Sequence, residues 1–247
     1  YEFFAIKLCK TVSTVITTSP VLAEELRRVG CQYEKIKLLP CCISQQTEQD
    51  ALSNPFSRYK KNQLKVIYIG RLDSYKRLDW LLLAAEEANR QCHEVIADFT
   101  DISVNIIGDG PRSQYFQEIA KNLSIHVHFY GKAAEDEKIK VLKDSDVLVL
   151  PSESSNEAFG IVQLEAMSAG VLSLAFSLPK SGMGWVCNLP DFNWSQDRKG
   201  LSTALKELAM TPGLSRRLGS QARKRYLDKF SHAVWKNNLM RILSCES

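Results

Sequence analysis

The amino-acid sequence predicts an α/β protein built on a doubly wound parallel sheet. Between residue 64 and about residue 210, short apolar segments alternate with amphipathic segments of helical spacing. One short segment, Val147–Leu150, is apolar at every position, which is typical of a strand buried on both faces of a parallel sheet. Turns that contain glycine follow the segments ending at Ile69 and Ile107. With 247 residues and 45% hydrophobic side chains, the chain can bury one large core and part of a second.

The first 48 residues are predicted to form a separate, partial unit. Val15–Thr18 and Lys35–Leu39 have the composition of short strands. Between them, Ser19 and Pro20 predict the start of a helix, because serine caps helix ends and proline suits the first turn. The polar residues 49–63 then predict a linker.

The main unit is expected over residues 64–214. Beginning with a strand, its alternating strands and helices are predicted at Lys65–Ile69, Leu78–Arg90, Val104–Ile107, Arg112–Asn122, Val127–Tyr130, Glu135–Lys143, Val147–Leu150, Gly160–Ala169 and Val171–Ala175. A break at Thr211–Gly213 ends the unit. Residues 215–247 are predicted to form C-terminal helices, the last of them capped by Ser231.

The loop and helix after the fully apolar strand contain the strongest candidate site, because open α/β sheets bind ligands where loops leave the carboxyl ends of strands. The backbone N–H groups of Phe159, Gly160 and Ile161 are expected at the helix start, where they favour an anion such as a diphosphate. Glu165 lies about one turn beyond Ile161, so its carboxylate could accept hydrogen bonds from hydroxyls beside that anion. The alternative is that Glu157 complements the helix N-terminus and that Glu165 lies on a solvated face. Two isolated glutamates at this spacing would be a weak motif.

A second candidate site follows the strand that ends at Ile69. Gly70 begins the turn, and Arg71 and Lys76 stand five positions apart ahead of the next helix. A guanidinium offers a planar fork of donors and an ammonium offers a mobile point charge, so the two side chains could clamp a diphosphate. The alternative is an ordinary basic helix cap with solvated charges.

These segments resemble the motifs of family 4 glycosyltransferases, which use nucleotide sugars, retain the anomeric configuration and have the GT-B fold of two Rossmann-like domains. The matching segments are Gly70–Lys76 and Glu157–Gly170, the second with two glutamates eight positions apart and a Glu-Ala-Met-x-x-Gly ending. The resemblance covers about residues 12–245 and is specific only over residues 66–175.

The resemblance implies a role for each candidate. Arg71 and Lys76 would hold and neutralise the donor diphosphate, together with the N–H groups of Phe159–Ile161. Glu165 would bind the ribose hydroxyls. Glu157 would bind the transferred sugar or the positive charge that develops at its anomeric carbon, which makes Glu157, Arg71 and Lys76 the candidate catalytic residues.

The resemblance adds Gly70, Gly108 and Lys132 to the candidate nucleotide pocket. Gly108 begins a G-x-G-P turn, and Lys132 follows the Phe-Tyr-Gly segment that reaches the base in this family. The turn also invites a dinucleotide-binding interpretation, but Ser113 stands where that motif has its third glycine. A tight turn and a strand end explain Gly108 and Lys132 equally well.

The implied enzyme is a hexosyltransferase that moves a sugar, with UDP-glucose as the expected donor, to a polysaccharide or lipid-linked acceptor in bacterial cell-envelope or exopolysaccharide synthesis. No further cofactor and no metal ion are expected. Asp144-Ser145-Asp146 does match the D-x-D pattern of metal-dependent glycosyltransferases. It precedes the apolar strand at its amino end, however, and the ligand crevice lies at the opposite edge of the sheet.

The domain organisation follows from the same resemblance. Residues 1–48 would be a remnant of an amino-terminal, acceptor-binding domain, residues 64–214 the donor domain, and residues 215–247 helices that pack back toward the amino domain. The turn Pro40–Ser44 departs from the family pattern. The chain is therefore expected to be the carboxyl-terminal portion of a longer enzyme, with transfer activity that depends on the rest.

Two other functions stay open. A non-catalytic nucleotide-sugar-binding module would keep the diphosphate and ribose contacts without needing Glu157. The intact glutamate pair argues against it, whereas Leu172 and Cys187, in a stretch where the family has other residues, favour altered sugar selection. A sugar-nucleotide epimerase of the GT-B fold is the other alternative; a phosphorylase would need a cofactor lysine that is not recognisable.

Composition limits the classes of partner. The 32 basic and 28 acidic residues leave no charge excess that would indicate nucleic acid binding. The sequence shows no run of about 18 apolar residues, and its first residues are not expected to form a signal peptide. Seven cysteines without C-x-x-C spacing predict reduced thiols and a cytoplasmic protein. The basic segment Arg216–Lys229 could touch the cytoplasmic face of a membrane, although a solvated helix face is the default.

Overall fold

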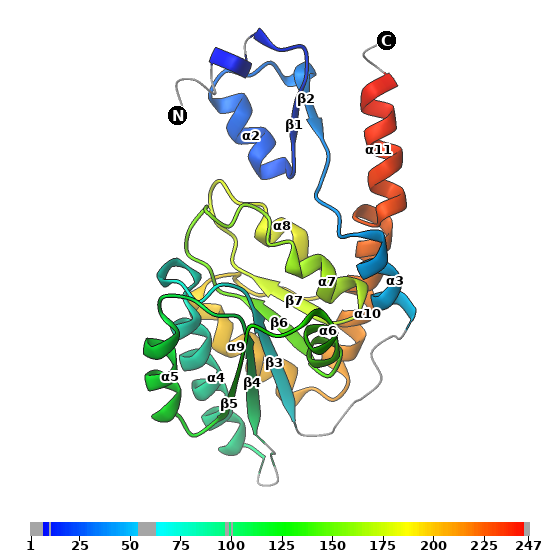
Figure 1. Cartoon of the computed structure of the whole chain (residues 1–247). Helices are drawn as coiled ribbons and strands as arrows, with labels where there is room; N and C mark the ends of the chain where they lie inside the picture. The colour runs from blue at the N-terminus through cyan, green and yellow to red at the C-terminus, as the bar shows by residue number, and fades with distance from the viewer. Residues whose placement is uncertain (1–6, 10, 54–62, 97–98, 100, 245–247) are drawn as a thin grey trace.

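The computed structural model describes residues 7–9, 11–53, 63–96, 99 and 101–244. It confirms the predicted class, because its larger sheet has five parallel strands in the order β5-β4-β3-β6-β7 (Figure 1). The strands are β3 (Leu64–Ile69), β4 (Ile102–Ile107), β5 (His126–Gly131), β6 (Val147–Leu150) and β7 (Leu172–Ala175).

Helices cover both faces of this sheet. The chain builds outward from β3 to β5, returns across the sheet, and builds outward in the opposite direction from β6 to β7. Because such crossovers are right-handed, α4 (Leu78–His93) and α5 (Ser113–Lys121) lie on one face, and α6 (Glu135–Lys143) and α7 (Val162–Ser168) on the other. Two later helices extend these layers: α9 (Arg198–Met210) packs on α4, and α10 (Leu214–Lys229) on α7.

The core is divided by the sheet, as the alternation of side chains along each strand requires. On β3, Val66 and Tyr68 belong to the apolar cluster on the α4 side, whereas Ile67 packs with Leu148 and Ala166 in the cluster on the α7 side. All five side chains are fully buried. Burial of this kind contributes about 1.5–3 kcal/mol for each large apolar side chain.

The N-terminal unit has the predicted elements in small form. Two three-residue parallel strands, β1 (Val15–Thr17) and β2 (Ile36–Leu38), flank α2 (Pro20–Arg28). A 3₁₀ turn, η1 (Tyr33–Lys35), precedes β2. The Ser19 hydroxyl accepts a hydrogen bond from the Leu22 N–H at 3.2 Å, which is the predicted helix cap.

The first residues of the predicted linker are helical. α3 (Gln45–Ser53) packs on α7, although it buries only Ala51 and has no apolar stripe that would have revealed it. The Glu48 carboxylate accepts from the Tyr226 hydroxyl at 2.8 Å and from the His232 N–H at 3.1 Å. Tertiary contacts therefore hold this helix. Residues 54–62 of the predicted linker lie outside the described part.

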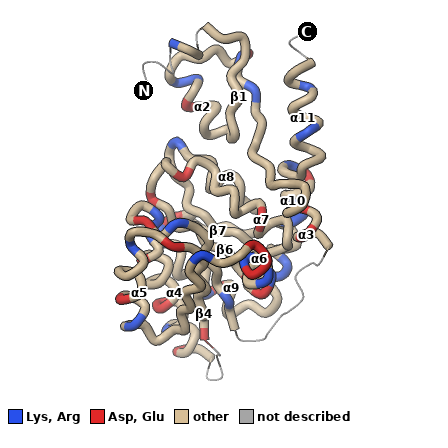
Figure 2. Tube along the Cα trace, in the orientation of Figure 1, with Lys and Arg blue, Asp and Glu red and all other residues tan. Residues whose placement is uncertain are grey.

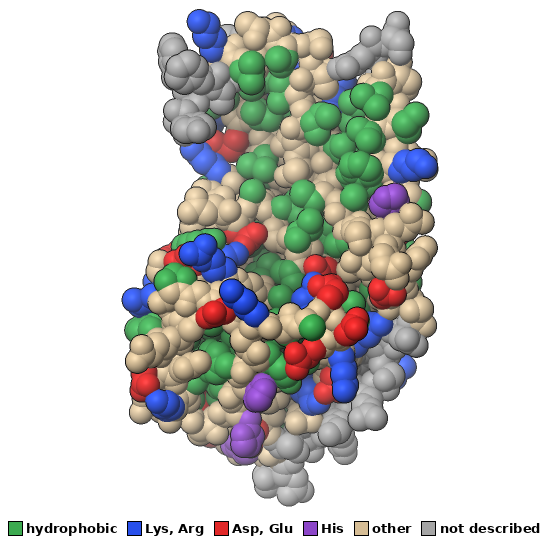
Figure 3. Space-filling view, viewed as in Figure 1, with side chains coloured by type: hydrophobic (Ala, Val, Ile, Leu, Met, Phe, Trp, Pro, Cys, Tyr) green, Lys and Arg blue, Asp and Glu red, His purple; other side chains and the backbone are tan. Residues whose placement is uncertain are grey.

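The C-terminal helices occur where predicted, with one correction. α11 (His232–Ser244) follows α10 directly, but the Ser231 hydroxyl donates to the Leu227 carbonyl, and Glu48 instead caps the His232 N–H. α11 runs back beside the N-terminal unit (Figure 1). A cavity of about 540 Å³ separates it from β2. Figure 3 shows hydrophobic side chains gathered over α11 and that unit. Among the described helices, none has the length and apolar character needed to cross a bilayer.

The Asp144–Asp146 segment has the strand-entry role expected of it. The Asp146 carboxylate accepts from the Lys65 N–H at 2.8 Å, and the Asp146 N–H donates to the Lys65 carbonyl at 2.8 Å. Asp144 forms an ion pair with the Lys65 ammonium. Both aspartates thus attach β6 to β3 at the amino edge. Burial raises the pKa of Asp146 to about 6, although the bond from Lys65 opposes this shift.

This pKa predicts how stability depends on pH. A carboxyl that titrates at about 6 in the fold, against about 3.9 unfolded, contributes stability that is full below pH 4 and lost as the pH rises through 6. Asp146→Asn keeps the acceptor and removes the titration. From pH 4.5 to pH 7.5, wild type should lose on the order of 2 kcal/mol of unfolding free energy relative to this variant. Urea unfolding at each pH measures the difference, and parallel curves for the two proteins would contradict it.

Candidate functional site

The loops after β3 and β4 are joined at the carboxyl edge of the sheet. The Gly70 N–H donates to the Ile107 carbonyl at 3.0 Å, and the Leu72 N–H donates to the Asp109 carbonyl at 3.1 Å. The Gly108 N–H continues this connection to β5, because it donates to the Gly131 carbonyl at 2.7 Å. Backbone contacts thus gather the predicted turns at one edge.

Gly108 is required by the close approach of these loops. Its φ of +136° favours glycine, and a Cβ there would lie 2.0 Å from the Gly70 carbonyl oxygen. The structure therefore brings Gly70 and Gly108 together. A contact of either residue with a nucleotide stays a prediction.

Gly108→Ala is expected to destabilise the fold by about 3 kcal/mol or more, because strain at positive φ adds to overpacking against backbone. Gly213→Ala is the matched control, since Gly213 also has a positive φ, +75°, but a Cβ there would meet no atom within 4 Å. That variant should lose only about 1–2 kcal/mol. Urea unfolding compares the two, and equal losses would refute the close-approach argument.

Lys76 and Glu157 are brought into contact from two different motifs. Lys76 ends a 3₁₀ turn, η2 (Ser74–Lys76), after β3, and Glu157 lies in the loop between β6 and α7. The Lys76 ammonium donates to Glu157 Oε2, and the two side chains are only 12% and 20% exposed. Burial lowers the pKa of Lys76, while the charge of Asp73 opposes this. Direct contact with a carboxylate favours the charged form, so we treat Lys76 as an ammonium.

Arg71 lies at the same edge but reaches into solvent. Its side chain is 67% exposed, and its Nε lies 3.5 Å from Asp73 Oδ2. The Tyr68 hydroxyl donates to the Arg71 carbonyl at 2.9 Å and fixes the backbone at this position. The guanidinium is thus anchored at its base and accessible at its end, as an anion-binding side chain requires.

The loop before α7 presents free donors. The helix begins at Val162, two residues later than predicted, because Gly160 has a φ of +70° and cannot belong to a right-handed helix. Within the described residues, the N–H groups of Phe159, Gly160 and Ile161 make no backbone hydrogen bond. These three N–H groups precede the helix and have no backbone partner in the described part of the chain, and their contact with an anion stays a prediction.

Two residues that the sequence did not reveal hold this loop. The Ser181 hydroxyl donates to the Glu157 carbonyl at 2.6 Å, and the Gly182 N–H donates to the Ala158 carbonyl at 2.7 Å. A Cβ at Gly182 would lie 2.6 Å from the Cβ of Ser19, so the cap of α2 packs directly beside the loop. The segment leads into α8 (Met183–Cys187), a short helix that the sequence did not predict. A serine-glycine pair in a polar run was the only signal.

Glu165 and Lys132 occupy separate positions at this edge. Glu165, on α7, forms an ion pair with Lys138 of α6 and contacts neither Glu157 nor Lys76. Lys132 is exposed near Asp109. The Ser113 hydroxyl and the Gly110 N–H lower the pKa of Asp109, and the charge of Lys132 adds to this effect.

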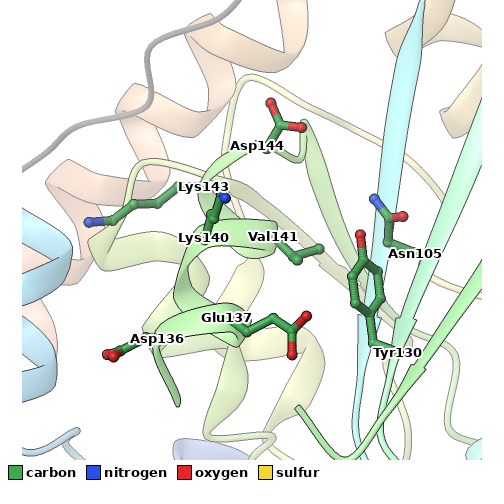
Figure 4. A pocket seen from close by; sticks show the side chains of 8 residues that line it. All are labelled: Asn105, Tyr130, Asp136, Glu137, Lys140, Val141, Lys143 and Asp144. Carbon is green, nitrogen blue, oxygen red and sulfur yellow. The ribbon is translucent and has the colours of Figure 1, made fainter. Parts of the chain in front are cut away.

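A large cavity lies elsewhere in the described part. It measures about 760 Å³ and lies between α6 and the strands β4 and β5 (Figure 4). Its lining includes Asn105, Tyr130, Glu137 and Lys140, but none of the predicted site residues. Volume alone does not identify a site, and the contact that joins the two predicted motifs, Lys76–Glu157, lies outside this cavity. Within the described residues, no group of three or more His, Cys, Asp or Glu side chains could hold a metal ion.

A known protein family and several known proteins are similar to this chain. The family described as "Glycosyl transferases group 1" matches residues 52–225. A phosphatidyl-myo-inositol mannosyltransferase of Mycolicibacterium smegmatis is 31% identical over 120 residues, which cover 49% of this chain and 29% of that protein. The chain therefore spans less than a third of this relative in the matched segment.

Two solved structures share the fold. Sucrose-phosphate synthase of Thermosynechococcus elongatus superposes with a TM-score of 0.74 at 23% identity, over 100% of this chain and 62% of that one. HepE of Anabaena, in complex with UDP and glucose, superposes with a TM-score of 0.71 at 18% identity, over 98% of this chain and 66% of that one. These likenesses confirm the GT-B type of parallel α/β fold.

Proposed function

The chain belongs to the glycosyl transferases group 1 family, and from this premise we propose that it binds the nucleotide sugar of a retaining hexosyltransferase. The contact between Lys76 and Glu157 is the main observation that supports the proposal. It joins a residue suited to a diphosphate with one suited to a sugar, across 81 positions of sequence. The accessible Arg71 and the free N–H groups of Phe159–Ile161 lie on the flanking loops.

The geometry suggests how the donor would be activated. Transfer breaks the bond between the anomeric carbon and the diphosphate, and the leaving diphosphate accumulates negative charge. Arg71, Lys76 and the loop N–H groups would stabilise that charge, and one such donor is typically worth about 3 kcal/mol of barrier. A diphosphate that engages Lys76 would also release Glu157, whose carboxylate could then face the sugar or the positive charge at its anomeric carbon.

The proposals for donor and acceptor rest on the side chains of the candidate site and on the similar proteins. UDP-glucose is our first candidate donor, supported by the structural likeness to a UDP-bound and glucose-bound protein. A mannosyl donor is the competing choice, since a relative is a mannosyltransferase. We propose that the acceptor is a polysaccharide or a lipid-linked glycan and that residues 1–48 are part of the unit that binds it. We also propose that the protein is cytoplasmic and that transfer requires no metal ion. A nucleotide-sugar-binding module without turnover, or an epimerase, remains the alternative.

Donor turnover tests the proposal. The chain is incubated with UDP-glucose, UDP-N-acetylglucosamine and GDP-mannose, with and without exhaustive chelation, and transfer of the sugar to water is followed as release of the nucleoside diphosphate. We expect release from one donor that survives chelation, with the free sugar formed first as the α anomer of the donor, which NMR detects before mutarotation. Loss of release after chelation would refute metal independence, an inverted product would refute retention, and binding without turnover would favour the module.

A further inference from the structure

The ion pair between α6 and α7 suggests a residue that prepares the nucleotide site. We propose that Lys138 is a positioning residue that keeps the Glu165 carboxylate ionised and fixes one of its oxygens, leaving the other for the ribose hydroxyls of the donor. This inference rests on the proposed donor site. The resemblance that indicated Glu165 assigned nothing to Lys138.

Lys138 contacts only one of the two carboxylate oxygens of Glu165. Lys138 Nζ lies 2.8 Å from Glu165 Oε2, and the two side chains are only 16% and 17% exposed. Oε2 is buried and its contact lacks the direction of a hydrogen bond, so the interaction is an ion pair. No donor of the described residues contacts Oε1 of Glu165. One oxygen is therefore committed to Lys138, and the other is available to a hydroxyl.

Charge balance explains why the lysine is needed. Burial raises the pKa of Glu165, and Lys138 opposes this shift. Burial alone would lower the pKa of Lys138, but its contacts with Glu165 and Glu135 raise it. A second ion pair, 2.9 Å from Lys138 Nζ to Glu135 Oε1, holds the ammonium in place. Without Lys138, the pKa of Glu165 would rise further, so a smaller fraction of the carboxyl would be ionised at a given pH.

The other described elements that pack on α7 supply no charge that shifts the pKa of Glu165. The strand β7 has no charged residue. From α3, Glu48 is engaged by Tyr226, and from α10, Arg223 donates to the Leu52 carbonyl at 3.0 Å. Besides Lys138, only Glu135 has a charge that acts on Glu165, and it raises the pKa. Lys138 is therefore the cation on which the ionisation of Glu165 depends.

The helix α6 offers a matched control. Acidic and basic residues stand side by side on it (Figure 2). Lys140 lies two positions from Lys138 but lines the large cavity (Figure 4). Lys140→Met therefore removes the same charge from the same helix without touching Glu165.

The test is the pH dependence of nucleotide affinity. UDP and GDP are titrated by calorimetry into wild type, Lys138→Met, Lys138→Arg and Lys140→Met from pH 6.5 to pH 9. We expect Lys138→Met to raise the Kd about tenfold at pH 7 and by a smaller factor as the pH rises, because a higher pH favours the ionised form of Glu165. Lys138→Arg should bind nearly as wild type, and Lys140→Met should change the Kd less than about twofold.

The double variant Lys138→Met with Glu165→Gln removes the titrating group, so its weakened binding should not vary with pH. Circular dichroism checks that each variant is folded. Wild-type affinity in Lys138→Met at pH 7, or a loss that is equal at every pH, would overturn the inference while leaving the donor site intact. If wild type bound neither UDP nor GDP, the proposed function itself would fail, and this inference with it.

Discussion

Replacing Lys76 by alanine is expected to reduce the turnover of the donor sugar by about 10²–10³-fold, because a buried ammonium next to the leaving diphosphate stabilises charge that develops in the transition state. Affinity for UDP should fall as well, by about tenfold or more, since a hydrogen bond to a charged group is worth about 1.5–3 kcal/mol. Steady-state kinetics and calorimetry measure the two effects on the same preparation.

Lys121→Met is the control for this experiment, because Lys121 is exposed and its ion pair with Glu118 lies within α5. It should leave both quantities unchanged. Lys76→Arg restores the charge but not the shape and should recover part of the affinity. Wild-type turnover in Lys76→Ala would remove Lys76 from the site.

Glu157→Gln should separate binding from turnover. The Glu157 carboxylate engages the Lys76 ammonium, so its neutralisation frees that ammonium for the diphosphate. UDP affinity should therefore be retained or rise by a few fold, while turnover falls about 100-fold or more because the group facing the sugar is lost. Glu165→Gln should have the opposite effect, with UDP affinity reduced more than turnover. Equal behaviour of the two variants would contradict the assigned roles.

The regular parts of the fold were predictable because their signals are local. α6 has the predicted bounds, with acidic residues in its first turn and lysines in its last, and β6 is apolar at every position. The helix α3 was not predictable, since it is held by Glu48 contacts with residues 178 and 184 positions away. The later start of α7 depends on the backbone conformation of Gly160. The division into units stays a prediction.

For the candidate site, the sequence predicts which loops lie at the same edge of the sheet, but not which of their side chains are in contact. Parallel strands imply that the turns after β3 and β6 meet, but not that Lys76 touches Glu157. Lys138 was missed because its partner lies on a neighbouring helix, and no spacing along one element reveals such a pair. Ser181 and Gly182 were missed for the same reason, since their contacts are with backbone atoms of another loop.

The central claim is that this edge of the sheet binds the diphosphate of a nucleotide sugar. Calorimetric titration of the chain with UDP, GDP and UDP-glucose in metal-free buffer tests it most directly. We predict binding of UDP and UDP-glucose that is lost in Arg71→Ala and retained in Lys121→Met. Binding that is unchanged by Arg71→Ala would place the nucleotide elsewhere, and no binding of any of the three ligands would contradict the account.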